Sequence, residues 1–225
     1  MKRTHVLLDL DGTISHSEPG IFRSLQWACE LEGFPTPTDA EVRRVIGPPL
    51  ELGLPAIGIP DDALERVINS YRDRYQRIGA FENTLYDGVL GMLDELAALG
   101  LSLSIATAKP EQTAHPVLDY FGISHRFDVR AGATLTSERR TKAQVIDFAL
   151  LELDIHGDPD MIDHVIMIGD RDHDVLGAMH HRITCVGVTW GYGSPGELMS
   201  AGAVALADSP AEVVELVQRE YGFRN

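Results

Sequence analysis

The sequence has few cysteines, few basic residues and no long apolar run, and each shortage excludes a class of protein. The two cysteines, Cys29 and Cys185, lie far apart in apolar stretches, which favours buried thiols over a disulfide framework. The apolar stretch after the N-terminal Met-Lys-Arg is interrupted at Asp9, too early for a signal-peptide core. No run reaches transmembrane length. These features predict a cytoplasmic protein without a membrane partner.

Positive charge is scarce relative to negative charge. The 225 residues include 34 Asp and Glu but 19 Lys and Arg, which gives a net charge of −15. Nucleic-acid backbones and anionic membranes attract basic patches, so neither is expected as a partner. An apolar fraction of 44% is sufficient for a substantial core. A monomer and a homodimer are both compatible with this composition.

Short apolar runs alternate with helical patterns along most of the chain. Continuous apolar runs are typical of parallel strands covered on both faces. Five are present, at 6–8, 101–106, 165–168, 184–188 and, more weakly, 204–206. Thr141 and Ser209 stand where helix caps are expected. The alternation predicts an α/β protein with a doubly wound, parallel-sheet (Rossmann-like) core formed by residues 1–14 and 87–225.

Residues 15–86 interrupt that alternation with helix-like segments alone, at 21–31, 39–46 and 61–78. We expect a small α-helical cap inserted after the first strand, beside the sheet edge where α/β proteins bind ligands. Arg23, on the first of these segments, and the Gly47-Pro48-Pro49 loop are candidates for contacts with the non-phosphate end of a substrate.

Three of the strand-like runs are followed by a polar residue: Asp9, Thr107 and Asp170. The carboxyl ends of parallel strands meet at one edge, so these side chains should converge. Lys142 begins a helix that can reach the same edge, and Asp174 lies one helical turn after Asp170. Crowded carboxylates need a cation, and Mg²⁺ prefers such hard oxygen ligands. The expected ligands are the carboxylates of Asp9 and Asp170 and the main-chain carbonyl of Asp11.

This set of residues suits phosphoryl transfer, which depends mainly on positioning and charge neutralisation. Asp9 can act as a nucleophile that forms an aspartyl-phosphate, and Asp11 can act as general acid and then general base. Lys142 and Thr107 can bind the phosphoryl oxygens. Gly12 permits a tight turn, which Thr13 can fix by hydrogen bonding back. The sequence therefore predicts a Mg²⁺-dependent phosphatase of a small phosphate monoester.

Four segments, DLDGT (9–13), IATAKP (105–110), RRTKAQVI (139–146) and GDRDHD (169–174), resemble the four motifs of the haloacid dehalogenase-like phosphatases. Four others resemble the phosphoglycolate phosphatase branch with its helical cap: EPGIFRSLQWACE (18–30), IGPPLE (46–51), YDGV (86–89) and WGYGSPGEL (190–198). The resemblance implies the same nucleophile and acid/base. It also implies that the substrate is bound by Thr107, Ala108, Lys142, Gly12 and Arg23. The implied Mg²⁺ ligands are Asp9, Asp11 and Asp170, and the residues that support the site are Asp174 and Thr13.

Some positions depart from the family pattern. His16 stands where relatives often have aspartate, which leaves substrate choice open, and Asp87 replaces a proline of the more familiar Tyr-Pro-Gly. Pro116 should make the helix after Thr107 start late or kink.

Other functions remain possible from the sequence. Asp11 and Asp170 disfavour a dehalogenase, which has no leaving alcohol to protonate and no need for Mg²⁺. A sugar-phosphate mutase of the same superfamily and a catalytically silent binding protein remain alternatives. The sequence does not choose between 2-phosphoglycolate, a nucleoside 5′-monophosphate and other small phosphates.

Overall fold

A computed structural model describes residues 4–45, 50–134 and 138–220 of the chain. It divides into two compact units, one formed by Met1–Ser15 and Leu85–Asn225 and the other by His16–Thr84. Two short strands, β2 (Ser15–His16) and β3 (Thr84–Leu85), form a two-stranded sheet where the chain passes from one unit to the other.

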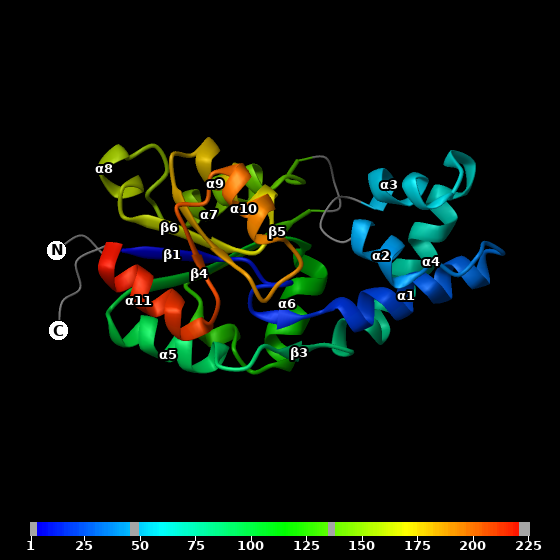
Figure 1. Cartoon of the computed structure of the whole chain (residues 1–225), viewed down its shortest axis with the longest axis horizontal. Coiled ribbons are helices and arrows are strands. Elements are labelled where there is room, and N and C mark those ends of the chain that lie inside the picture. Colours follow the sequence, from blue (N-terminus) through cyan, green and yellow to red (C-terminus); the bar gives the residue numbers. More distant parts are fainter. Residues whose placement is uncertain (1–3, 46–49, 135–137, 221–225) are drawn as a thin grey trace. The chain divides into compact units, whose positions relative to one another are not determined.

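The first unit contains a six-stranded parallel sheet with the order β5-β4-β1-β6-β7-β8 (Figure 1). Its strands are β1 (His5–Leu8), β4 (Ser102–Pro110), β5 (Val129–Ala133), β6 (Val165–Gly169), β7 (Thr184–Val188) and β8 (Ala205–Ala207). The predicted α/β fold class is confirmed. Strand β5 was not predicted, because its sequence VRAGA mixes an arginine and a glycine into the apolar pattern.

Strand β1 lies at the centre, and its register brings the predicted site residues level. Leu8, its last residue, is paired with Ile105 of β4 on one side and Ile168 of β6 on the other. Asp9 comes one residue after this level, and Thr107 and Asp170 come two residues after it on the neighbouring segments, so the three lie close together as the parallel-strand argument requires.

Helices cover both faces of this sheet. Helices α5 (Val89–Ala98), α6 (Glu111–Tyr120) and α11 (Pro210–Glu220) lie on one face, and α7 (Lys142–Glu152) and α9 (Asp172–His180) on the other (Figure 1). The shorter α8 (Pro159–Ile162) and α10 (Pro195–Ala201) precede β6 and β8. The sequence predicted that the helix after Thr107 starts late or kinks, and the late start is wrong. Helix α6 begins at Glu111 and continues past Pro116, whose missing N–H leaves one intrahelical bond unmade.

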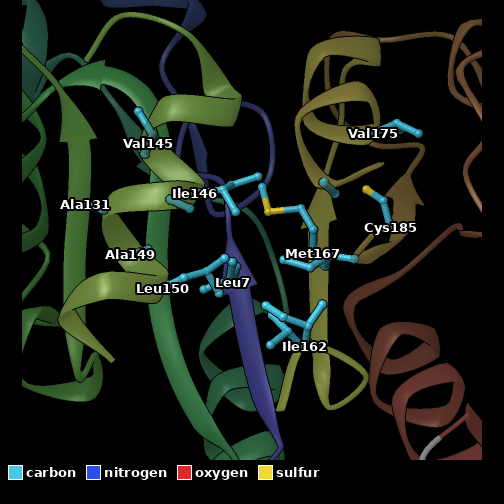
Figure 2. Close-up of a cluster of buried hydrophobic side chains, with 14 of the residues drawn as sticks. Leu7, Ala131, Val145, Ile146, Ala149, Leu150, Ile162, Met167, Val175 and Cys185 are labelled. Atoms are coloured by element: carbon cyan, nitrogen blue, oxygen red, sulfur yellow. The ribbon is translucent and has the colours of Figure 1, made fainter. Parts of the chain in front are cut away.

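The core between α7, α9 and the sheet consists of buried side chains, most of them aliphatic. In Figure 2, Leu150 of α7 lies beside Leu7 of β1, and Ile146 of α7 extends toward Met167 of β6. Helix α7 begins with a capping box in which Thr141 accepts from the Gln144 amide and Gln144 accepts from the Thr141 amide. Core packing and cap together fix the residue that starts this helix, Lys142.

The second unit is helical. Its helices are α1 (Glu18–Leu31), α2 (Asp39–Val45), α3 (Leu50–Gly53) and α4 (Leu64–Arg77), with short 3₁₀ turns at Leu54–Ile57, Asp61–Ala63 and Gly79–Phe81. Helix α1 packs against α4 and the turn at Gly79. A side chain at Gly20 would put its Cβ 1.9 Å from the Gly79 carbonyl oxygen, so this close approach requires glycine.

Candidate active site

The ammonium of Lys142 binds two of the predicted aspartates. Its Nζ lies 2.8 Å from Asp9 Oδ1 and 2.7 Å from Asp174 Oδ1, and it donates to the Ala106 carbonyl oxygen at 2.8 Å. Its side chain is 1% exposed. The first residue of α7 thus joins the end of β1 to the first turns of α9, three places that are distant in the sequence.

Burial and crowding shift the pKa values of these groups in different directions. Burial raises the pKa of Asp9, and Lys142 offsets this in part while Asp174 adds to it. Burial also raises the pKa of Asp170 well above its usual value, with repulsion from Asp174 and Asp9. Burial opposes the charged forms of Asp174 and Lys142, but their ion pair outweighs it, so the pKa of Asp174 is lowered and that of Lys142 is raised.

Asp170 is held by two segments of backbone. Its Oδ2 accepts the Tyr192 amide at 2.8 Å, and its Oδ1 accepts the Thr13 hydroxyl at 3.3 Å. Thr13 therefore reaches across to another strand, where the sequence predicted a bond back into its own turn. A Cβ at Gly12 would lie 2.2 Å from Asp170 Oδ2, and one at Gly191 would lie 2.3 Å from Asp170 Cβ. Glycines on both sides allow this carboxylate to fit between the two loops.

Residues 190–193 were noted in the sequence only for their resemblance to the phosphoglycolate phosphatase branch. Their contacts with the site were not predicted. The Trp190 indole N–H donates to the Thr13 carbonyl oxygen at 3.1 Å, which ties this segment to the turn after β1. The Gly-Tyr-Gly spacing was the available signal, since glycines on both sides of one residue can mark a close backbone approach.

Thr107 and Ala108 lie within the last residues of β4, with Thr107 buried and Ala108 half-buried. The Thr107 hydroxyl accepts the Lys109 amide at 3.2 Å. Gly12 has a φ of 89°, in the left-handed region that its predicted turn requires.

Lys109 is a site residue that the sequence interpretation missed. Its Nζ donates to both carboxylate oxygens of Asp11, at 2.8 Å and 3.1 Å. The side chain of Lys109 is 5% exposed and that of Asp11 is 19% exposed. A signal was present: the whole chain has three lysines, Lys2, Lys109 and Lys142, and two of them stand in the segments that carry the motifs. Lysine is rarely buried without a partner, so a lysine at the end of a buried strand predicts a carboxylate nearby.

The oxygen donors at this edge suit Mg²⁺. Asp9, Asp170 and Asp174 are all buried, and only one ammonium, that of Lys142, bridges two of them in the described part of the chain. The remaining negative charge favours a bound divalent cation. Asp9 and Asp170 offer carboxylates beside the Asp11–Gly12 backbone.

A second grouping includes His173, which the sequence interpretation did not single out. Within the described residues, ligand atoms of Asp9, His173 and Asp174 lie within 4.8 Å of one another. Lys142 already bridges the two aspartates of this group, and an imidazole is not a preferred Mg²⁺ ligand. We therefore interpret His173 as an electrostatic neighbour that helps to lower the pKa of Asp174.

In the helical unit, the Arg23 guanidinium donates to Glu82 Oε1 at 3.0 Å, and its side chain is 60% exposed. Glu82 also accepts from Arg74 at 2.9 Å, and Arg74 donates to the Ser24 hydroxyl. These contacts account for the position of the Arg23 side chain, and no contact with a substrate is needed to explain it. The Gly47-Pro48-Pro49 loop lies outside the described residues.

A protein-family model described as "Haloacid dehalogenase-like hydrolase" matches residues 6–188. The tyrosine-protein kinase PtkA of Mycobacterium tuberculosis is 38% identical over 188 residues, which make up 84% of this chain and 62% of that protein. The chain thus matches less than two thirds of the length of that relative. A 5′-nucleotidase of Pseudomonas aeruginosa is 34% identical over 199 residues, 88% of each protein.

A phosphoglycolate phosphatase of Xanthomonas campestris is 28% identical over 83% of each protein. Among solved structures, a predicted phosphatase from Clostridium acetobutylicum is similar with a TM-score of 0.88 and 32% identity, covering 97% of this chain and all of that one. In the described residues no helix is long and apolar enough to cross a membrane.

Proposed function

The chain belongs to the haloacid dehalogenase-like hydrolase family, and on that premise we propose that it is a Mg²⁺-dependent phosphatase of nucleoside 5′-monophosphates. One observation carries the reaction: a buried lysine bridges Asp9 and Asp174 at the edge of the sheet where the central strand ends. The substrate class is supported by the similarity to the 5′-nucleotidase, which extends over nearly the full length of both chains.

Each residue has a defined task in this proposal. Asp9 attacks phosphorus, and the bond to the leaving oxygen breaks as Asp11 gives that oxygen a proton. Water then attacks the aspartyl-phosphate while Asp11 takes a proton from it, which restores Asp9 and releases inorganic phosphate. Lys142 and Thr107 hold the phosphoryl oxygens, and Asp174 keeps Lys142 in place. Mg²⁺, when bound by Asp9, Asp170 and the Asp11 carbonyl, supplies further charge neutralisation.

A hydrolysis assay with a panel of phosphate esters tests both the reaction and the substrate. The panel contains AMP, GMP, dAMP, dTMP and 2-phosphoglycolate, each with Mg²⁺ and with excess chelator, and released phosphate is measured. We expect the highest kcat/KM among the nucleotides and no turnover with chelator. A preference for 2-phosphoglycolate would replace the nucleotide assignment. No phosphate release from any ester would overturn the phosphatase assignment.

A second candidate is phosphoryl transfer to a tyrosine hydroxyl, favoured by the 38% identity to the kinase. The same aspartyl-phosphate can pass its phosphoryl group to an alcohol in place of water, so the site residues alone do not separate the two. Incubation with ATP labelled in its γ-phosphate and a tyrosine-containing peptide separates them. Label on the peptide would indicate transfer, and label in free phosphate alone would indicate hydrolysis.

A mutase differs from a phosphatase in transferring the phosphoryl group to another sugar hydroxyl and not to water. With a sugar monophosphate as substrate, an isomeric sugar phosphate would form in place of free phosphate. Measuring both products in one reaction decides between hydrolysis and this alternative.

A further inference from the structure

The ion pair between Lys109 and Asp11 is a feature of the site that the reaction described above leaves unused. Lys109 Nζ lies 2.8 Å from Asp11 Oδ2 and 3.1 Å from Oδ1, so the ammonium contacts both oxygens of the carboxylate. Two contacts to one group restrict its rotation as well as its position. A lysine that is 5% exposed has little solvent to compensate its charge, which makes a carboxylate partner necessary.

Lys109 lies near the end of β4, just before the point where pairing with β5 resumes after a register shift. Its amide donates to Thr107, and the next residue, Pro110, is paired with Ala133 of β5. A Cβ on Gly132 would lie 2.7 Å from the Lys109 carbonyl oxygen, so β5 packs directly against this point. A side chain on a strand that pairs with a neighbour is placed more accurately than one on a loop.

Asp11, in contrast, lies in the turn after β1. An isolated bridge pairs it with Ser15, and the Gly12 amide donates to the Ser15 carbonyl oxygen. These contacts fix its backbone. Lys109 contacts both oxygens of its carboxylate, so β4 determines where the side chain points.

We propose that Lys109 is a positioning residue that directs the carboxyl group of Asp11 toward the leaving oxygen and then toward the attacking water. The proposal rests on the phosphatase function proposed above. Lys109 exchanges no proton in it. When Asp11 gives its proton to the leaving oxygen, the carboxylate that forms remains beside an ammonium, and the proton that Asp11 regains comes from water. The two acids of the DLDGT segment thus have one lysine each, Lys142 for Asp9 and Lys109 for Asp11.

The test compares leaving groups. A nucleoside alkoxide needs a proton to leave, whereas nitrophenolate does not, so the comparison of AMP with p-nitrophenyl phosphate reports on Asp11. The parameter is kcat/KM, which covers only the steps up to the first phosphoryl transfer. Lys109→Met should lower kcat/KM for AMP by about 10- to 100-fold and that for p-nitrophenyl phosphate by much less. Lys109→Arg, which keeps the charge, should recover part of the loss.

A double-mutant cycle with Asp11→Asn distinguishes positioning from an independent role. If Lys109 acts through Asp11, the double variant should be no slower on AMP than Asp11→Asn alone. Additive losses would overturn the proposal. Equal losses of kcat/KM on both substrates would also overturn it, because they would indicate that Lys109 binds phosphate or supports the site in general. Wild-type kinetics in Lys109→Met would overturn it as well.

Two controls keep the result interpretable. Arg139→Met breaks another partly buried ion pair near the end of β4, the one with Glu111. It should change kcat/KM for both substrates by the same factor. Circular dichroism melting identifies a variant that does not fold, and Lys109→Gln, which retains a donor, then replaces Lys109→Met. A wild-type protein that hydrolyses neither substrate indicates failure of the proposed function, whereas an active wild type with an unselective Lys109→Met indicates failure of this inference alone.

Discussion

Ion pairs occur in both units of the molecule, but in different surroundings. At the sheet edge of the first unit, Lys142 and its two aspartates are almost completely buried. In the helical unit, three arginines that pair with glutamates are mostly exposed, at 60% for Arg23 and 63% for both Arg43 and Arg66, whereas Arg74 is 16% exposed. The same pairing chemistry therefore has a high desolvation cost in one unit and a low one in the other.

This difference shows which charges are informative about function. An exposed pair contributes about 0–1 kcal/mol and is easily formed, so its presence says little. A buried group of three aspartates, of which one lysine bridges two, has a cost in stability, which indicates a functional requirement such as cation and phosphate binding. Substitutions in the two units should differ accordingly.

The largest effect is expected from Asp9→Asn. Asparagine keeps the shape of the side chain but is not a nucleophile, so turnover should fall by about 10⁴-fold or more. Phosphate release under saturating AMP and Mg²⁺ measures the loss, and circular dichroism checks that the fold persists. Turnover near that of the wild type would show that Asp9 is not the nucleophile.

Lys142→Met should have the next largest effect, on stability. It removes the cation from between Asp9 and Asp174 and leaves two buried carboxylates without their partner, which should cost about 3–5 kcal/mol. Urea unfolding measures this free energy. The matched control is Arg66→Met, whose exposed pair with Glu32 should contribute less than about 1 kcal/mol. Equal losses in the two variants would contradict the contrast between the units.

Asp170→Asn should stabilise the metal-free protein while abolishing Mg²⁺-dependent activity. Burial and repulsion raise the pKa of Asp170, so its charged form destabilises the fold at neutral pH. An asparagine can still accept from the Tyr192 amide and can donate to the Thr13 hydroxyl. We expect a melting temperature higher by about 2–4 °C for each kcal/mol gained.

The pH dependence of the stability gained in Asp170→Asn follows from the raised pKa of Asp170. A raised folded-state pKa means that the contribution of Asp170 to stability is complete below its ordinary value of 3.8 and is lost as pH rises through the raised value. The difference between variant and wild type should therefore be largest at neutral pH and shrink toward acid pH. A variant less stable than the wild type at pH 7 without metal would show that Asp170 is not destabilising.

The sequence was sufficient for five of the six strands and for most residues at the edge of the sheet, because parallel strands place their following residues together whatever the details of packing. Asp9, Thr107 and Asp170 were predicted in this way, and Lys142 from its place at the start of a helix. Lys109 was missed because its side chain is directed by the extension of β4 to Pro110, which an apolar pattern ending at Ala106 does not show. The path of Thr13 to Asp170 was missed because it depends on how two loops meet.

The smallest effect is expected from Arg23→Ala in the helical unit. Arg23 shares Glu82 with the less exposed Arg74, which also donates to Ser24, so loss of Arg23 leaves Glu82 with a partner. The free energy of unfolding should change by no more than about 0.5–1 kcal/mol. Arg74→Ala is the matched comparison and should cost more, since it removes both contacts. For activity, the sequence-based hypothesis that Arg23 contacts the non-phosphate end of the substrate predicts a lower kcat/KM for AMP with p-nitrophenyl phosphate unaffected. The ion pair with Glu82 favours the alternative, in which kcat/KM is unchanged for both substrates. A loss on AMP alone would establish that Arg23 leaves Glu82 to contact substrate, and a large loss of stability would show that even an exposed pair of this unit is required for its fold.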